Sequence, residues 1–273
     1  MPEGHTLHRL AREQRTLFAG RPVRVSSPQG RFAEGAALLD GRLLTRTEAY
    51  GKHLLHYYDG APTLHVHLGL YGKFTTGAGE PPEPVGALRL RLVTDGHWTD
   101  LRGPTACELL DPAEVAGLFG RLGPDPLRPD ADPQRAWQRL AGSRTAIAAL
   151  LMDQRVIAGI GNVYRAELLF RHRLDPYLPG RALPPERWHA MWLDLVRLMR
   201  HGVRVGRIET LRPDDRPRKR GPLARHEAGY VYRRAGLPCR ICGTDVRTEV
   251  LVGRNLYWCP NCQPPGAAGT DWI

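Results

Sequence analysis

Four cysteines near the C-terminus constrain the fold of this chain more than any other feature. They form two C-x-x-C pairs, Cys239/Cys242 and Cys259/Cys262, with sixteen residues between the pairs. This spacing allows four thiolates to surround one Zn²⁺ ion, as in a zinc ribbon. The alternatives are two disulfides or a redox motif, but a redox C-x-x-C is typical of a βα unit, and this segment lacks that pattern. We therefore expect one structural zinc ion with these four cysteines as its ligands.

The segment between the two cysteine pairs is expected to be a β-hairpin. Residues 246–258 alternate between apolar and polar side chains, and Gly253-Arg254-Asn255 provides a turn. A hairpin of this size buries too little apolar surface to fold alone, so bound metal must supply on the order of 10 kcal/mol of its folding free energy. The metal-bound hairpin would hold Arg254 rigidly at its tip.

The charge of the chain indicates a polyanionic partner. With 39 Lys and Arg against 28 Asp and Glu, the formal net charge is +11. Such an excess favours nucleic acid as the partner ahead of a membrane surface. Only three of the cationic side chains are Lys, so the position of a Lys is informative in this chain.

The sequence predicts a cytoplasmic protein that has no membrane partner. The first sixteen residues contain no apolar core of the kind found in signal peptides, and no apolar run approaches the ~20 residues of a membrane span. The zinc ribbon uses four of the five cysteines, which leaves Cys107 as an expected buried thiol in a reducing compartment. We expect the protein to associate with the nucleoid when it is bound to DNA.

The N-terminal part of the chain predicts an antiparallel β-sandwich with one leading helix, over residues 1–122. Apolar residues between Leu7 and Phe18 recur at helical spacing, and Gly20 ends this helix. Leu and Arg alternate at 88–92, which predicts a strand with one buried face and one basic face. Hairpin signals join neighbouring strands. The expected strands cover residues 21–27, 42–50, 53–58, 63–71, 87–94 and 97–101.

The C-terminal half is expected to be helical before the zinc ribbon begins. Residues 123–132 are rich in proline and form a linker, after which Asp132 caps a helix that starts at Pro133. Amphipathic segments follow at 145–153, 162–172 and 184–201. Residues 212–225 predict a mobile basic loop that is either solvated or in contact with DNA. The expected domains are a helical domain over 133–235, the zinc ribbon over 236–265 and a tail over 266–273.

A glycine-rich turn, Gly159-Ile160-Gly161-Asn162, joins two of the helical segments. Glycines let the backbone approach a ligand, and the N-terminus of the following helix favours a phosphate. The short amide of Asn162 could reach the same phosphate. A dinucleotide-binding turn would follow a strand, whereas this one follows a helix. A plain helix–helix turn remains the alternative.

Three further groups of residues could carry function. Lys52 can act as an acid or a nucleophile because Lys, unlike Arg, can lose its proton near neutral pH; an ordinary surface Lys is the alternative. His65 and His67 lie on one side of a strand, but without a third ligand they are better interpreted as hydrogen-bonded histidines than as a metal site. Leu70 and Tyr71 follow that strand and either join the core or wedge between DNA bases.

Several motifs together resemble the formamidopyrimidine-DNA glycosylase/endonuclease VIII family. They are MPEGH at the start, GKHLL at 51–55, HLGLYG at 67–72, GIGNVYRAE at 159–167 and GRNLYWCPNC in the ribbon, in the family's order from end to end. The resemblance implies an α+β fold in which the β-sandwich and a helix–two-turns–helix domain form a cleft for DNA, followed by the zinc ribbon. It also implies a bifunctional DNA glycosylase and abasic-site lyase that acts on damaged DNA and uses no organic cofactor. We expect it to act as a monomer.

The resemblance assigns roles to individual residues. Pro2 would be the nucleophile, Glu3 the proton-transferring carboxylate and Lys52 the second catalytic amine. Asn162 and Arg254 would hold the phosphates that flank the damaged nucleotide. The wedge of endonuclease VIII would correspond to two neighbouring side chains, Leu70 and Tyr71.

The chain departs from the family pattern at two positions. Thr6 stands where the family commonly has Glu, so proton relay or lesion choice is expected to differ. Gly69 replaces a longer polar residue beside the wedge. The arginine-arginine-phenylalanine wedge of the formamidopyrimidine branch is missing, because the chain has DLRGPT at 100–105. These features place the chain in the endonuclease VIII branch, which favours oxidised pyrimidines as lesions.

Two other classes of protein fit parts of the sequence. One is a non-enzymatic protein that binds damaged or bent DNA through the ribbon and the helical domain. The other is a zinc-ribbon protein that binds RNA or acts in translation. The N-terminus discriminates between these classes and the glycosylase, since a retained Met1 blocks the amine of Pro2.

Overall fold

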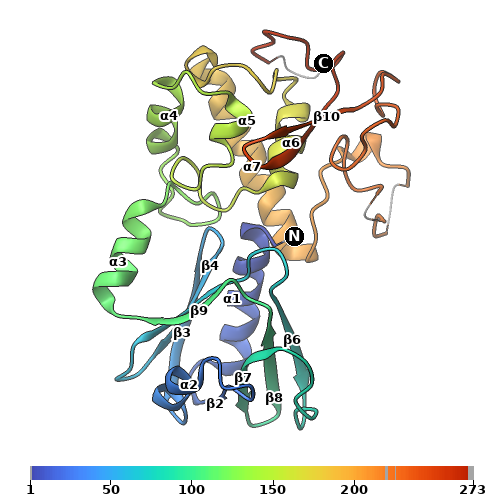
Figure 1. Cartoon of the computed structure of the whole chain (residues 1–273). Coiled ribbons are helices and arrows are strands. Elements are labelled where there is room, and N and C mark those ends of the chain that lie inside the picture. The colour runs from blue at the N-terminus through green and yellow to red at the C-terminus, as the bar shows by residue number, and fades with distance from the viewer. Residues whose placement is uncertain (1, 219–220, 225, 270–273) are drawn as a thin grey trace. The chain divides into compact units, whose positions relative to one another are not determined.

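The computed structural model of the 273-residue chain describes residues 2–218, 221–224 and 226–269. The chain divides into two compact units, Met1–Arg121 and Leu122–Ile273. Unit 1 is the blue-to-green part of Figure 1 and unit 2 is the green-to-red part. Each unit has its own hydrophobic core.

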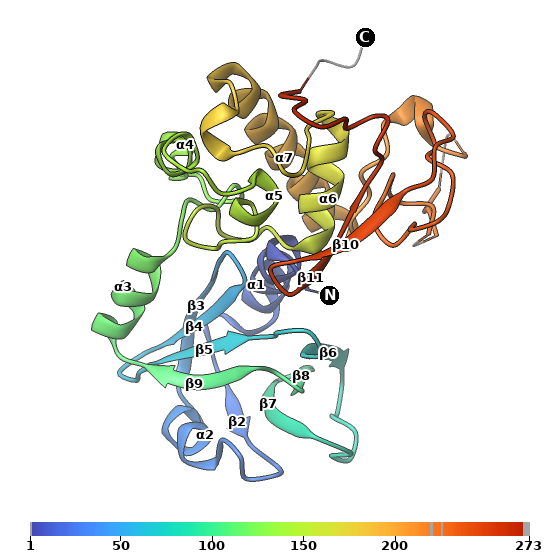
Figure 2. The same cartoon turned by 45° about the horizontal axis from the view of Figure 1, so that its top comes forward.

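Unit 1 is built from two antiparallel sheets, which Figure 2 shows from above. The strand order of the five-stranded sheet is β1 (Arg21–Pro22), β3 (Leu43–Tyr50), β4 (His53–Tyr58), β5 (Thr63–His67) and β9 (Ala106–Leu110). The order of the four-stranded sheet is β2 (Arg24–Ser26), β7 (Leu88–Thr94), β8 (His97–Arg102) and β6 (Lys73–Ala78). The predicted antiparallel sandwich is confirmed.

The leading helix α1 (Gly4–Phe18) packs its apolar side into the core of unit 1. Its direction follows from its contacts with β3. The Gly20 amide donates to the Leu44 carbonyl at 2.8 Å, and Arg15 donates to the Thr47 carbonyl at 2.9 Å. Residues further along β3 are thus contacted by residues nearer the start of α1, so the helix and the strand run in opposite directions. The start of α1 and the turn after β3 therefore lie at the same end of unit 1, as Figure 1 shows.

Two helices of unit 1 were not predicted from the sequence. The first, α2 (Ala33–Leu39), has seven residues and is too short to show a helical period. The second, α3 (Pro112–Arg121), starts with a reciprocal cap between Asp111 and Glu114. The amide of each residue donates to the carboxylate of the other, at 2.8 Å in both cases. This is a capping box, and the D-x-x-E spacing is its signal in the sequence.

Three expectations about strands were wrong. The strand expected over 21–27 is divided into β1 and β2, which belong to different sheets. The strand expected over 63–71 ends at His67 in β5, and the chain turns before the separate strand β6. The expected basic face of β7 is also missing, because Arg91 is buried and forms two hydrogen bonds with Asp100, at 2.7 and 2.9 Å. Arg91 faces Asp100 across the β7–β8 register. A carboxylate on the neighbouring strand therefore neutralises a side chain that alternation alone places at the surface.

Unit 2 is helical around one buried helix. Its α-helices are α4 (Pro133–Ala141), α5 (Ile147–Leu150), α6 (Asn162–Arg171) and α7 (Pro185–Val205). Every residue of α6 except Val163 is buried. The predicted start of α4 is confirmed, because the Asp132 carboxylate accepts from the Gln134 amide at 2.8 Å and Pro133 is the first residue of the helix.

The zinc ribbon contains a hairpin of β10 (Arg247–Leu251) and β11 (Arg254–Trp258). The turn consists of Val252 and Gly253, with φ of 50° and 67°, so the turn predicted at residues 253–255 was placed too far along the chain. Two-residue hairpin turns with positive φ at both positions match the twist of the strands. Arg254 and Asn255 are consequently the first residues of β11.

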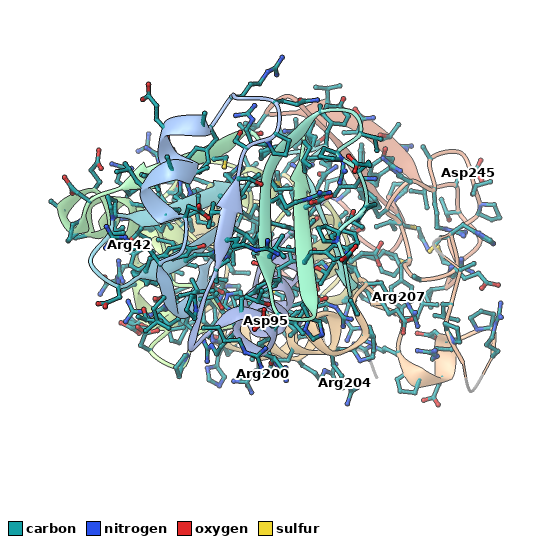
Figure 3. All side chains as sticks on the ribbon, turned by 90° about the horizontal axis from the view of Figure 1, so that it is seen from below. Arg42, Asp95, Arg200, Arg204, Arg207 and Asp245 are labelled. Atoms are coloured by element: carbon teal, nitrogen blue, oxygen red, sulfur yellow. The ribbon has the colours of Figure 1, made fainter. Side chains whose placement is uncertain are left out.

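Basic side chains of unit 2 are partly solvated and partly paired. Figure 3 labels Arg200 and Arg204, which are exposed one turn apart on α7. In the predicted basic loop, Arg216 donates to Glu209 at 3.2 Å and Arg218 donates to Glu227 at 2.6 Å. Acidic partners therefore hold part of this segment. Lys219, Arg220 and Arg225 lie outside the described residues. Among the helices described, none combines the length and the hydropathy that crossing a membrane requires.

Candidate functional site

The N-terminal residues lie at the start of α1. Pro2 is half-buried, and Glu3 is the fully buried residue that precedes the helix. The Glu3 side chain makes no capping hydrogen bond to its own helix. The buried Glu3 directly follows Pro2, an arrangement suited to proton transfer beside the amine that removal of Met1 exposes.

Lys52 is held at the tip of the β3–β4 hairpin. Tyr50 pairs with His53, so Gly51 and Lys52 form a two-residue turn. Gly51 has φ of 57°, which a glycine adopts without strain. The direction of α1 places this turn and Glu3 at the same end of unit 1 (Figure 1). The three residues to which the resemblance assigns catalysis thus belong to one end of one unit.

Thr6, which stands where the family commonly has Glu, forms an uncharged pair with His5 in the first turn of α1. The Thr6 hydroxyl lies 3.3 Å from Nε2 of His5. Burial lowers the pKa of His5 to about 4, so its imidazole is neutral at physiological pH. Neither side chain provides the carboxylate that the family commonly has at position 6.

Leu70 and Tyr71 project from the loop between β5 and β6. Leu70 is 42% exposed and Tyr71 is 86% exposed, so the alternative that they belong to the core was wrong. Gly69 before them has φ of 64°, and a Cβ there would lie 1.9 Å from Oγ1 of Thr105. Local packing therefore imposes glycine at position 69.

The strand histidines form hydrogen bonds. Nδ1 of His65 lies 2.9 Å from a carboxylate oxygen of Glu108, and Nε2 of His65 lies 2.8 Å from Nδ1 of His53. Both ring nitrogens of His65 are therefore occupied by protein partners. For His65 this agrees with the interpretation as a hydrogen-bonded sheet histidine.

In unit 2 the glycine-rich turn is held by a side chain that the sequence did not single out. The Gly159 amide donates to Oε1 of Gln154 at 3.0 Å. The Gln154 amide donates in turn to the Ile160 carbonyl at 2.9 Å. This clamp fixes the turn that leads into Asn162, the first residue of α6. No local pattern in the sequence marks Gln154 for this task.

Asn162 connects α6 to the zinc ribbon. It is buried, and its Nδ2 donates to the Asn255 carbonyl at 2.9 Å. The fully buried Arg165 donates to the same carbonyl at 3.2 Å and also to Oδ1 of Asn162. Asn255 follows Arg254, whose side chain is exposed. The structure thus brings Asn162 to the backbone of Asn255, the residue next to Arg254, within unit 2.

Glu167 is a further residue that sequence reasoning missed. Its fully buried carboxylate accepts the amides of Tyr230, Val231 and Tyr232, at 2.7, 2.9 and 2.8 Å. It also accepts the Thr210 hydroxyl at 2.6 Å. These bonds replace the water that a buried charge loses. Glu167 therefore fixes the segment before the ribbon against α6.

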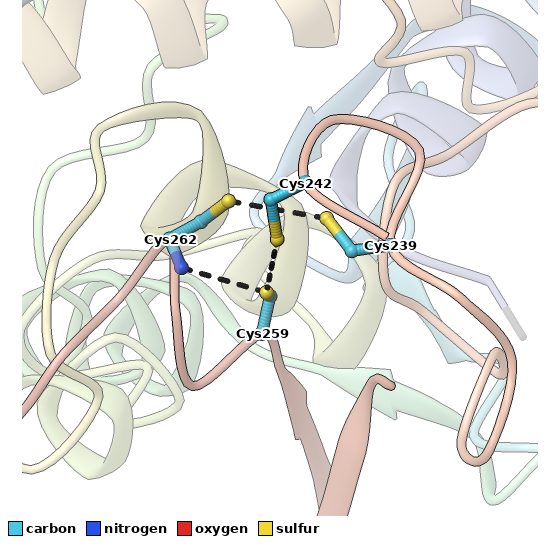
Figure 4. A group of neighbouring side chains, drawn as sticks. All are labelled: Cys239, Cys242, Cys259 and Cys262. Atoms are coloured by element: carbon cyan, nitrogen blue, oxygen red, sulfur yellow. Dashed lines mark hydrogen bonds between the residues drawn. The ribbon is translucent and has the colours of Figure 1, made fainter. Parts of the chain in front are cut away.

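The four cysteines form a site of the size that zinc requires. Their sulfur atoms all lie within 4.8 Å of one another. Sγ of Cys239 and Cys262 are 3.9 Å apart, and Sγ of Cys242 and Cys259 are 3.4 Å apart (Figure 4). Four thiolates at about 2.3 Å from a tetrahedral zinc ion would be separated by about 3.8 Å. The cysteines are not in disulfides.

Protonation opposes metal binding at two of these thiols. Burial raises the pKa of Cys259, to about 11, and raises that of Cys262 further, with nearby thiols adding to the shift. A metal ion must displace these protons to bind, so its affinity falls as pH falls.

Three family models match separate segments that together cover most of the chain. Residues 1–107 match the family model of the formamidopyrimidine-DNA glycosylase N-terminal domain, and residues 122–213 match that of the formamidopyrimidine-DNA glycosylase H2TH domain. Residues 236–265 match a zinc finger found in FPG and IleRS. The chain belongs to the formamidopyrimidine-DNA glycosylase/endonuclease VIII family.

Individual relatives agree with this assignment. Endonuclease 8 1 of Mycobacterium tuberculosis is 58% identical over 267 residues, which cover 96% of this chain and 100% of that protein. The crystal structure of the MutM (FPG) protein from Thermus thermophilus has a TM-score of 0.77 and 31% identity, and covers 97% of this chain and 100% of that one. A complex of Lactococcus lactis Fpg with abasic-site DNA, at 20% identity, has a TM-score of 0.78, covers 96% of this chain and 99% of that one, and shares the fold.

As a member of the formamidopyrimidine-DNA glycosylase/endonuclease VIII family, the chain is a DNA glycosylase with abasic-site lyase activity in base excision repair. The α+β fold expected from the sequence and the structural zinc site are both confirmed.

Proposed function

We propose that this glycosylase removes oxidised pyrimidines through a Schiff base on Pro2, followed by β- and δ-elimination. The observation that carries the proposal is the placement of Pro2, the buried Glu3 and the Lys52 turn at one end of unit 1. The non-enzymatic alternative is not favoured, since the named relatives are enzymes.

The covalent step requires a free amine at Pro2. Removal of Met1 produces a secondary amine, and an α-amino group with a pKa near ~8 is partly neutral at physiological pH. Attack of this amine on C1′ displaces the base and leaves a cationic iminium ion after the sugar ring opens. The iminium withdraws electrons from C2′ and makes its protons acidic. Loss of a C2′ proton then expels the 3′ phosphate, and a second elimination expels the 5′ phosphate.

Glu3 and Lys52 are proposed to manage protons and charge in this sequence. Glu3 can protonate the sugar ring oxygen as the ring opens, because burial favours the protonated form of a carboxyl group and that form can act as a general acid. The ammonium group of Lys52 can stabilise negative charge that develops during base departure. The base must leave the stack, since C1′ is shielded in a paired duplex.

We propose that unit 2 supplies phosphate contacts. The exposed guanidinium of Arg254 can bind a phosphate in two hydrogen bonds. Asn162 uses Nδ2 for the Asn255 carbonyl, but an amide nitrogen has two hydrogens. The second can reach a phosphate beside the same hairpin. The protein is proposed to act as a monomer on nucleoid DNA in the cytoplasm.

Borohydride trapping tests the chemistry. With zinc-loaded protein lacking Met1, reduction in the presence of abasic-site DNA should give a covalent adduct, and peptide mass spectrometry should locate it at Pro2. Glu3→Gln should lose base excision far more than cleavage of a preformed abasic site, while Glu34→Gln, at an exposed residue of α2, should match the wild type. Absence of any adduct would refute the Schiff-base mechanism.

A panel of duplexes that each contain one lesion tests the substrate. The exposed Leu70 and Tyr71 can fill the gap left by an extruded nucleotide, whereas Gly69 adds no side chain to hold the opposite base. Oxidised pyrimidines should therefore be excised faster than 8-oxoguanine. A strong preference for 8-oxoguanine opposite cytosine would reverse this assignment.

A further inference from the structure

One buried guanidinium joins the start of α6 to the zinc ribbon. Arg165 lies one turn after Asn162 on α6 and is fully buried. Strand β11 packs against this helix (Figure 2), and Leu256 of β11 belongs to the core that the helices of unit 2 form. This packing brings the carbonyl of the preceding residue, Asn255, to the N-terminus of α6. No step of the proposed reaction uses Arg165.

Three hydrogen bonds connect the groups at this junction. Nδ2 of Asn162 donates to the Asn255 carbonyl at 2.9 Å, and Nη2 of Arg165 donates to the same carbonyl at 3.2 Å. Nη2 of Arg165 also donates to Oδ1 of Asn162. A carbonyl oxygen has two lone pairs, so it can accept both donors. Arg165 therefore contacts both Asn162 and the ribbon directly.

The donors of Arg165 determine which way the Asn162 amide faces. A guanidinium stays protonated and can only donate, and a carbonyl can only accept. If the amide were reversed, its nitrogen would face the guanidinium donor and its oxygen would face the Asn255 carbonyl. Both hydrogen bonds of the amide would be lost, and both contacts would become repulsive. Arg165 thus adds a second hydrogen bond that favours the observed orientation over the reversed one.

We propose that Arg165 is a positioning residue for Asn162: it fixes the amide with Oδ1 turned toward the guanidinium, so that the remaining Nδ2 hydrogen is offered to a DNA phosphate. This rests on the phosphate contact proposed for Asn162. The amide nitrogen has two hydrogens, and the Asn255 carbonyl takes one of them. A phosphate oxygen can only accept, so a reversed amide, which would present its own oxygen, would repel it. The N-terminus of α6 favours an anion at this end of the helix.

Neutron diffraction from deuterated wild-type protein tests the orientation directly, because deuterium positions distinguish the amide nitrogen from the amide oxygen. We expect the deuterated nitrogen of Asn162 beside the Asn255 carbonyl, and a deuterium on Nη2 of Arg165 directed at Oδ1 of Asn162. This measurement needs no variant, so it does not depend on whether a substitution at a buried site folds. A wild-type amide in the reversed orientation would overturn the inference.

DNA binding by variants tests whether the orientation matters. The duplex carries a tetrahydrofuran abasic analogue, which has no C1′ hydroxyl and cannot form a Schiff base. Asn162→Ala should weaken binding about tenfold, the effect of one hydrogen bond to a charged group. Arg165→Met, which removes the donors but keeps a long unbranched side chain, should weaken it about fivefold. Arg165→Lys keeps a donor and should lose less. In an Asn162→Ala background, Arg165→Met should cause no further loss.

Salt dependence separates this role from general support of the ribbon. Asn162 carries no charge, so Arg165→Met should lower the affinity without changing the slope of log affinity against log salt. Displacement of Arg254 would instead flatten the slope by about one unit, and that result would overturn the inference. Arg171→Lys is the matched control, since Arg171 is a buried arginine near the other end of α6 and pairs with Asp194 at 2.7 Å. It should retain the wild-type affinity and slope.

The outcomes separate the inference from the proposed phosphate contact. An unchanged affinity for Asn162→Ala would refute that contact and the inference with it. A loss for Asn162→Ala together with wild-type affinity for Arg165→Met would overturn the inference alone. Additive losses in the double variant, or loss of zinc from Arg165→Met, would assign Arg165 to support of the fold and would also overturn it.

Discussion

Each unit has one cation of interest in or directly after a two-residue hairpin turn, but the two hairpins are stabilised differently. Lys52 follows Gly51 in the β3–β4 turn, and Arg254 follows Gly253 after the β10–β11 turn. Along β4, the strand after Lys52, most side chains are buried, whereas four of the five residues of β10 are exposed. The first hairpin is stabilised by a hydrophobic core. The second depends on the zinc ion that its cysteines bind.

This difference is consistent with the two roles proposed for Lys52 and Arg254. A core-supported hairpin suits a group that must hold its position during chemistry, because burial orders the strands on both sides of it. The zinc ribbon needs few buried residues, so a small domain can extend Arg254, which we propose binds a phosphate. The cost is that the position of Arg254 depends on metal and on pH.

Loss of zinc should have the largest effect, because it should unfold the β10–β11 hairpin and leave the β3–β4 hairpin folded. Cys259→Ser should unfold the hairpin, since metal binding supplies on the order of 10 kcal/mol in such small domains. Elemental analysis should find one zinc in the wild type and a reduced content in the variant. DNA affinity should fall sharply, while hydrogen exchange in the β3–β4 amides stays slow. Cys107→Ser, at a buried thiol of unit 1, is the control that should retain zinc.

Wild-type protein without zinc would contradict the assignment of the ribbon. A parallel loss of protection in unit 1 on zinc removal would show that the two hairpins are not independently stabilised.

Acid should next affect unit 1, through buried histidines. Burial lowers the pKa of His56 to about 4, and that of His5 to about 4. A histidine whose pKa is lower in the folded protein than its ordinary 6.5 contributes full stability above pH 6.5 and loses it as pH falls toward 4. The slope is up to about 1.4 kcal/mol per pH unit for each such group. Hydrogen exchange, corrected for intrinsic rates, should show β3 and β4 less protected at about pH 5 than at about pH 7.5.

The variant His189→Gln, at an exposed site on α7, should leave this acid response unchanged. His56→Gln should flatten it, because the residue that titrates is gone and an amide takes its place beside Gln14, which lies 2.7 Å from Nε2 of His56. Equal protection at both pH values would show that these histidines do not control stability.

Short sequence patterns correctly predicted the parts of the fold that are determined by residues close together along the chain. The bounds of β4, the cap at Asp132 and the cysteine spacing each follow from a short stretch of sequence. The capping box before α3 was equally local and was overlooked. The turn of the ribbon was misplaced by one residue because Gly253 can occupy either position of a tight turn.

The candidate site could not be completed from the sequence because its supports are distant along the chain. His65 and Glu108 are 43 residues apart, and Asn162 and Asn255 are 93 residues apart. Strand register and packing bring these pairs together, and neither is encoded by a local pattern. The alternating pattern likewise predicted Arg91 at the surface, because a pattern within one strand carries no information about Asp100 on the next strand.

The smallest effect expected concerns Arg254 itself. Arg254→Ala should weaken binding to lesion-containing and undamaged DNA alike, because a phosphate contact carries no sequence information. The slope of log affinity against log salt should flatten by about one unit, as one phosphate contact is lost. Arg247→Ala is the matched control, since Arg247 is also exposed in the hairpin but pairs with Trp258 at its other end. The control should bind zinc and retain the wild-type slope. A loss confined to damaged DNA with an unchanged slope would assign Arg254 to recognition of the lesion, and its hairpin would then read the base as well as position the duplex.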